Sequence, residues 1–280
     1  MESHGGSCGN AAQPGIREGL RKSAQPLNLT LGVKEKVVAD KIETEIVSMS
    51  GSPIYRHGEA APWQAPKGEE CLEQISDHIE KHLGKVETVF HEIVSDIVHI
   101  DVHFVKPTSE FPFVRLITSG MSDLPMTTPK GSDAPQFVEL LITLPADWHL
   151  DQKSFESETW YWPVRLLKGL ARLPHSYKTW LGWGHTIPNG DPPEPYAENT
   201  RLCGSIVLPS ITVPDNFHTL FIDDRKTITF YSVVPLYEEE MNFKLRSGTD
   251  PLLDKLSKRN VTDIIDLSRV NVSKKWLGLL

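Results

Sequence analysis

Three side chains able to bind a metal ion occupy every second position of one short segment: His99, Asp101 and His103. Residues 97–105 alternate apolar and polar side chains, which predicts a β-strand with these three residues on one face. Imidazole and carboxylate groups are suitable ligands for zinc or iron. Residues two apart on a strand are separated by about 6.6 Å along it, which is a stretched geometry for a single ion.

The pattern has two interpretations. In the first, the three residues are ligands of a metal-dependent hydrolase, and His175 or His185 supplies a further ligand. In the second, they form the solvated face of a sheet, where polar residues are expected to alternate with apolar ones. We favour the second interpretation. The sequence therefore predicts no bound metal and no cofactor, with the hydrolase as the alternative.

Few other patterns in the sequence indicate catalysis. The chain contains neither of the phosphate-binding patterns G-x-x-x-x-G-K-[ST] and G-x-G-x-x-G. Its three cysteines, Cys8, Cys71 and Cys203, are odd in number and far apart, which argues against a disulfide framework or a zinc cluster. We therefore predict no catalytic residues.

Aromatic residues gather around a predicted central helix, residues 163–173. They are Trp160, Tyr161, Trp162, Trp180 and Trp183. Such a group either forms a recognition surface, since Trp and Tyr dominate binding hot spots, or closes one end of the hydrophobic core. Both interpretations remain open. The segment that follows the helix, residues 175–201, is long for a loop in a compact domain, which is typical of a functional loop.

The composition is that of an ordinary globular protein. The chain has 280 residues, of which 39% are hydrophobic and 24% charged, and its net charge is -8. The acidic balance argues against a nucleic-acid partner, because such proteins need a basic patch. No apolar run is long enough to span a membrane, and the first ten residues lack the apolar core of a secretory signal. We expect a cytoplasmic protein without a membrane partner.

The remaining patterns predict the order of the elements. Residues 1–66 are expected to form a poorly ordered N-terminal extension and linker, and residues 67–280 the compact domain. Predicted helices cover residues 72–83, 163–173, 236–245 and 251–258, and predicted strands cover 86–93, 97–105, 113–118, 137–144, 203–208, 219–222 and 227–234. Pro163 is expected in the first turn of the central helix and Pro174 at its end. The fold class is therefore α+β, with a central, largely antiparallel sheet and helices packed against it.

An ordered series of segments resembles the Suppressor of fused domain family, in its bacterial branch. The segments are Leu116–Met126, Val138–Pro145, Trp162–Leu173, Thr179–Pro188 with His185, and Ile228–Glu240. Together they span roughly residues 70–270, so residues 1–66 fall outside the resemblance.

The resemblance implies binding and not catalysis. The animal member of the family is a sequestering protein that pairs with an extended peptide of a transcription factor, and bacterial members include immunity proteins of toxin systems. The segment Ser119–Met126 resembles a region near the animal peptide cleft, which implies a partner-binding role for Ser122 and Asp123. Residues from the aromatic-rich segment 175–201 complete the predicted partner-binding set, which is Ser122, Asp123, Trp180, Trp183 and His185. An acidic chain suits a basic protein partner, for example a nuclease toxin.

Overall fold

The structure is a computed structural model that describes residues 46–68, 71–91 and 96–274. In chain order its elements are β1 (Ile46–Val47), β2 (Pro53–Ile54), α2 (Leu72–Leu83), β3 (Val86–Phe90), β4 (Asp101–Val105), β5 (Phe113–Ser119), η1 (Met121–Asp123), β6 (Phe137–Pro145), η2 (Ser154–Glu156), α3 (Glu158–Tyr177), β7 (Thr186–Pro188), β8 (Gly204–Leu208), η3 (Asp215–Phe217), β9 (Thr219–Asp223), β10 (Lys226–Leu236), α4 (Glu238–Ser247) and α5 (Thr249–Ser257). No helix among the described residues has both the length and the apolar character that a membrane crossing requires.

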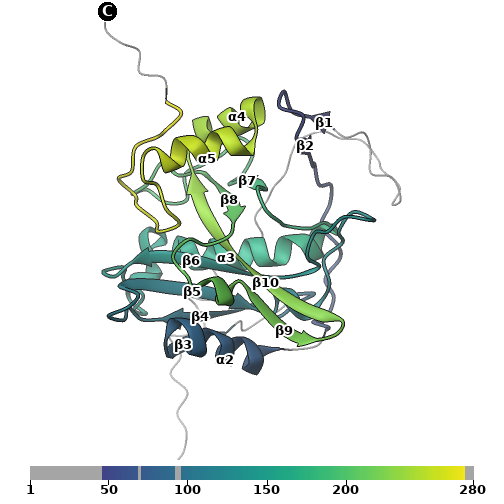
Figure 1. The fold of residues 1–280 in the computed structure, drawn as a ribbon, viewed down its shortest axis with the longest axis vertical. Coiled ribbons are helices and arrows are strands. Elements are labelled where there is room, and N and C mark those ends of the chain that lie inside the picture. Colours follow the sequence, from purple (N-terminus) through teal and green to yellow (C-terminus); the bar gives the residue numbers. More distant parts are fainter. Residues whose placement is uncertain (1–45, 69–70, 92–95, 275–280) are drawn as a thin grey trace, which may run out of the picture.

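An eight-stranded sheet forms the centre of the molecule (Figure 1). Its strand order is β3-β4-β5-β6-β10-β8-β7, and β9 pairs with β10 beside this path. Every pairing in the sheet is antiparallel except that of β10 with β6, which is parallel. Helices pack against this sheet, so the predicted α+β class with a largely antiparallel sheet is confirmed.

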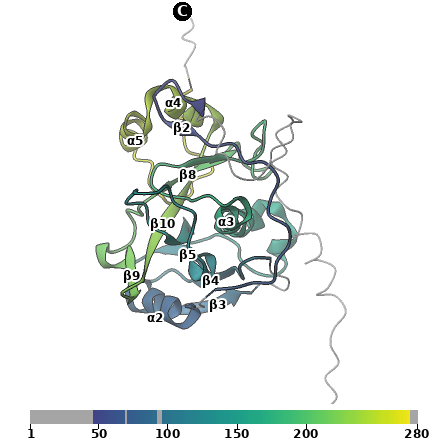
Figure 2. The same ribbon diagram turned by 90° about the vertical axis from the view of Figure 1, so that its right-hand side faces the viewer.

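Helices cover both faces of the sheet, with α3 on one side and α2 on the other (Figure 2). Leu116 and Leu140 belong to the core cluster that contains the buried residues of α3. Their chain neighbours Ile117 and Leu141 belong to the cluster that contains Ile75 of α2. Since successive residues of a strand point to opposite faces, β5 and β6 are apolar on both.

The expectation of a solvated face around His99, Asp101 and His103 is wrong. Asp101 is only 3% exposed and His103 is fully buried. The side chain of Val105, two residues further on this face of β4, belongs to the cluster around α2. The polar residues of β4 therefore point toward the side of the sheet that α2 covers, and only His99 remains partly exposed.

The central helix is longer than its two prolines predict, because α3 begins five residues before Pro163 and continues past Pro174. The hydroxyl of Ser157 caps its first turn by accepting from the backbone N–H of Thr159. Pro163 lacks the N–H that would bond to the carbonyl of Thr159, and Asn199 Nδ2 lies 3.5 Å from that oxygen instead. The helix ends at Tyr177, and the next residue, Lys178, caps it with a left-handed backbone.

The last part of the predicted extension and linker, residues 46–66, lies against the domain. Its backbone bonds to three separate parts of the domain. Ser50 N donates to Leu245 O of α4, and Ala61 N donates to Ser176 O of α3. Gln64 O accepts from the N–H of Ile97, in the chain that leads into β4. In Figure 2 this segment runs from β2 past α3. Residues 1–45 lie outside the described part of the chain.

Candidate functional site

The predicted partner-binding residues Ser122 and Asp123 belong to a tight turn at the end of β5. Gly120 begins this turn with a φ of 101°, in the left-handed region that favours glycine. A Cβ at this position would collide with the carbonyl oxygen of His99. The absence of a side chain at Gly120 therefore lets the turn pack directly against the chain that leads into β4.

Ser122 holds this turn to the sheet interior. It is fully buried, and both its backbone N–H and its hydroxyl donate to Glu139 Oε1, at 2.9 and 2.6 Å. Thr118 donates to the other carboxylate oxygen at 2.5 Å. Burial raises the pKa of the Glu139 carboxyl, and the hydrogen bonds from Ser122 and Thr118 act in the opposite direction. The Ser122 hydroxyl thus faces the core and orders the backbone of the turn.

Asp123 lies nearer the surface, where it is 9% exposed. It lines an open hollow of about 260 Å³ between the turn, the start of β6 and the β9–β10 hairpin. The hollow is lined by Gly68, Asp123, Pro125, Phe137, Asp223, Arg225 and Lys226. The N-terminal segment, residues 46–68, approaches the turn closely at its end, where a Cβ at Gly68 would collide with the Asp123 carbonyl.

The aromatic loop, residues 178–185 between α3 and β7, forms a second part of the candidate site. The rings of Trp180 and His185 lie 5.2 Å apart between centroids, and Tyr55 of the N-terminal segment packs edge-on against Trp180 at 4.8 Å. Trp183 projects from the same loop and is 50% exposed. Tyr55 was not among the predicted site residues, because no local pattern links residue 55 to a loop more than a hundred residues later.

The turn and the aromatic loop are packed together. Thr127 N donates to Thr179 O at 3.0 Å, and Leu181 N lies 3.4 Å from Met126 Sδ. His175 Nε2 is 2.8 Å from the carbonyl oxygen of Met121. The structure therefore brings the two predicted groups of partner-binding residues into one continuous region.

The aromatic residues before the predicted helix belong to the core instead. Trp162 is fully buried and stacks on Tyr196 with ring centroids 4.9 Å apart. Trp160 is partly buried, packs edge-on against Trp148 and accepts that residue's indole N–H at its carbonyl. The core interpretation therefore holds for Trp160 and Trp162, whereas Trp183 is exposed.

His185 should make the folded protein less stable in acid. Burial, with the charge of Lys244, lowers the pKa of His185 from its ordinary 6.5 to about 4. Below pH 6.5 the unfolded chain binds a proton that the folded chain does not accept until about pH 4. The stability that the neutral His185 contributes is fully present above pH 6.5 and is lost as the pH falls to about 4. The free energy of unfolding should fall by about 1–3 kcal/mol over this range.

Urea denaturation at several pH values in this window measures the effect, with His185→Phe as the matched variant. Phenylalanine keeps an aromatic ring against Trp180 but has no titratable group. Its stability should therefore depend less steeply on pH than that of the wild type. Identical pH slopes for the two proteins would show that His185 is not the responsible group.

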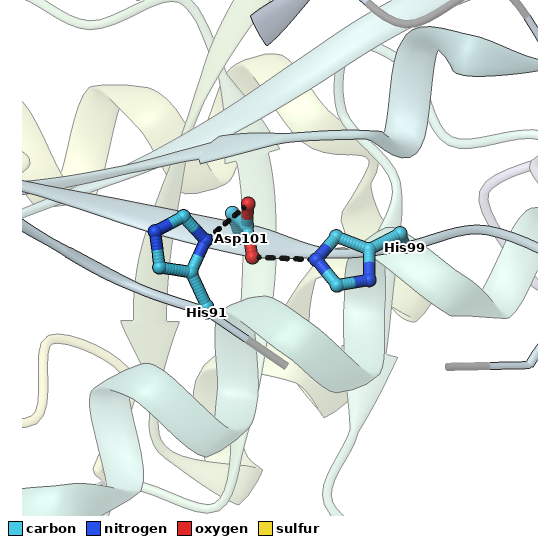
Figure 3. Close-up of side chains that lie close together, drawn as sticks. All are labelled: His91, His99 and Asp101. Carbon is cyan, nitrogen blue, oxygen red and sulfur yellow. Dashed lines mark hydrogen bonds and ion pairs between the residues drawn. The ribbon is translucent and has the colours of Figure 1, made fainter. Parts of the chain in front are cut away.

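The alternative metal trio, His99, Asp101 and His103, is not brought together by the structure. Asp101 is flanked by His99, whose Nε2 lies 3.0 Å from Oδ1, and by His91, whose Nδ1 lies 2.9 Å from Oδ2 (Figure 3). His103 Nε2 lies instead 2.9 Å from the hydroxyl of Ser119, and burial lowers its pKa to about 4. The suggested fourth ligand His175 bonds to Met121 O and is not part of this cluster.

Sequence reasoning missed His91, although a signal for it exists. Strand β3 pairs with β4 in a register that places Phe90 opposite Val102. The next antiparallel pair places His91 opposite Asp101. As a neighbour for Asp101, a histidine directly after the paired strand β3 was therefore a better candidate than His103, which lies two residues from Asp101 on β4.

Comparison with known proteins identifies the family of the chain. The model of the family described as Suppressor of fused protein (SUFU) matches residues 96–270. The chain belongs to the Suppressor of fused family. The matched region of this family runs from just before β4 to beyond α5, so it contains both the turn at Gly120 and the aromatic loop.

Solved structures share the Suppressor of fused fold with this chain. A crystal structure described as a SUFU homolog from Neisseria gonorrhoeae has a TM-score of 0.53 at 15% identity, covering 73% of this chain and 97% of that one. The crystal structure of a Sufu–Fu complex has a TM-score of 0.50 at 17% identity, covering 74% and 93%. Among curated proteins, no match to the chain was found.

Proposed function

We propose that the chain is a non-enzymatic protein-binding module of the Suppressor of fused type that acts in the cytoplasm. Family membership supports a module of this type, and one structure of similar fold is that of a Sufu–Fu complex. The partner we propose is a basic toxin, which the chain neutralises as an immunity protein.

The half-exposed indole of Trp183 is the observation that carries this proposal. Large aromatic side chains that remain exposed on a well-packed loop are typical anchors of binding interfaces. Trp180 and His185 pack against each other in the same loop. The turn that carries Asp123 continues to Thr127, whose N–H bonds to the carbonyl of Thr179 just before the loop's aromatic residues. In this arrangement Trp183 contacts the partner, whereas Ser122 contributes by holding the turn.

The charge of the chain supports a basic partner. A net charge of -8 attracts a cationic protein and repels an acidic one. The attraction raises the association rate with a cationic partner at low salt, where charges are less screened. Association with such a partner should accordingly slow as the ionic strength rises.

Truncation of Trp183 should weaken partner binding without unfolding the domain. We expect Trp183→Ala to raise the dissociation constant by about 30-fold or more, equivalent to about 2 kcal/mol for a hot-spot residue. The measurement is titration calorimetry with the toxin encoded by a neighbouring gene, together with rescue of growth when the two are co-expressed.

Trp63→Ala is the matched control. Trp63 is also an exposed tryptophan, at 65%, but it belongs to the N-terminal segment and has no part in the aromatic loop. Its truncation should leave the affinity unchanged. Equal losses in the two variants, or failure of the wild type to bind any such toxin, would refute the proposal.

A further inference from the structure

We propose that His91, His99 and Asp101 bind one divalent transition-metal ion of the zinc class. The three come from the end of β3, the approach to β4 and the first residue of β4, so strand pairing brings them together (Figure 3). Two imidazoles and one carboxylate are a suitable ligand set for such an ion, and three protein ligands leave a coordination position open. This site is independent of the proposed partner-binding role.

The three residues lie close enough together to reach one ion after their side chains adjust. One ligand atom from each residue lies within 4.8 Å of the others. A tetrahedral zinc ion, with bonds of about 2.0–2.2 Å, holds its ligand atoms about 3.3–3.5 Å apart. The two histidines lie at hydrogen-bond distance from different oxygens of Asp101, 2.9 Å from Oδ2 and 3.0 Å from Oδ1. A cation would replace these hydrogen bonds, and the side chains would rotate so that one atom from each residue faces the ion.

The burial of the three side chains differs in a way that suits this function. The side chain of Asp101 is 4% exposed and is fixed on a strand that pairs with β5, where Asp101 lies opposite Ser119. The side chains of His91 and His99 are 63% and 38% exposed. The carboxylate is therefore held on a strand inside the protein, whereas both imidazoles are accessible to an ion that arrives from solvent.

The site adjoins the turn that carries Ser122 and Asp123. The His99 carbonyl lies against Gly120, so a cation bound by the His99 ring would restrain the chain on which the turn rests. A group that binds only the folded state also stabilises it. Metal binding should thus raise the unfolding temperature of the domain.

The test is a titration of the full chain, freed of any affinity tag and of metal, with Zn²⁺. Calorimetry should detect a site in the wild type that His91→Ala and His99→Ala each weaken by about 100-fold or more, because changes in outer-shell residues alone cost about 10–100-fold. Cobalt substituted at the site should give the visible absorption of a four- or five-coordinate ion, and both variants should lose it.

His149→Ala is the control, because His149 is an exposed histidine that packs on Trp160 and lies outside the cluster. It should bind Zn²⁺ as the wild type does. Since His91 is exposed and His99 is partly exposed, their variants should remain folded, which circular dichroism verifies. Absence of binding in the wild type, or unchanged binding in both histidine variants, would overturn the proposal and leave the cluster as a hydrogen-bonded bridge between strands.

Discussion

Replacing Arg269 by leucine should lower the free energy of unfolding by about 3–5 kcal/mol, because it leaves a buried carboxylate without its counter-ion. Glu240 is fully buried, and Arg269 donates to both of its oxygens, at 2.7 and 2.6 Å. The same carboxylate accepts the backbone N–H groups of Tyr237 and Val272, so it connects the start of α4 to the C-terminal segment. Removal of the guanidinium therefore weakens a connection between two parts of the chain as well as a single ion pair.

Urea denaturation of three variants tests this expectation. Adding Glu240→Gln to Arg269→Leu should recover part of the loss, since a neutral amide is less costly to bury than an unpaired charge. The control is Lys106→Ala, which breaks an exposed ion pair with Glu87 at 2.7 Å and should therefore have a much smaller effect on stability. If Arg269→Leu costs no more than Lys106→Ala, the pair does not behave as a buried one.

Gly120→Ala should destabilise the domain by more than about 3 kcal/mol, through two effects that add. The left-handed backbone of Gly120 is unfavourable for any residue with a Cβ. In addition, the new methyl group would collide with the carbonyl of His99, which is backbone and cannot rotate away. Relief of the collision requires the turn to separate from the approach to β4.

Gly131→Ala separates these two effects. Gly131 also has a positive φ, 76°, but nothing lies within 4 Å of its added Cβ. The free energy of unfolding of this variant should fall by about 1–2 kcal/mol, which is the cost of a left-handed backbone at a residue with a Cβ. The difference between the two variants in chemical denaturation then measures the close approach at Gly120, and equal losses would show that no such close approach exists in solution.

The sequence alone determined the features that depend on neighbouring residues. Helix α2 was predicted residue for residue as Leu72–Leu83, because its apolar spacing and the glycine that follows are local signals. Most strands of the large sheet and the α+β class followed from alternation and from the order of elements, although β4 begins at Asp101 and not at residue 97, and β7 was not predicted. The ordered segments also indicated the Suppressor of fused family, and the comparison confirmed it.

Local signals were insufficient where neighbouring elements decide the environment. Period-two alternation shows which side chains share a face of β4, but it cannot show that a helix covers that face. Asp101 and His103 were therefore placed in water, although the structure buries them. The N-terminal bounds of α3 were missed for a related reason, since Asn199 lies near the carbonyl that Pro163 leaves without its usual partner.

Only the tertiary structure decided which chemistry-bearing residues meet. Pairing of β3 with β4 replaces His103 by His91 beside Asp101, and the path of residues 46–68 brings Tyr55 to Trp180. The parallel pairing of β10 with β6 likewise joins strands about ninety residues apart. These contacts depend on strand register and chain path, which are set by the packing of the whole domain, whereas the sequence pattern within any one segment specifies only that segment's own conformation and faces.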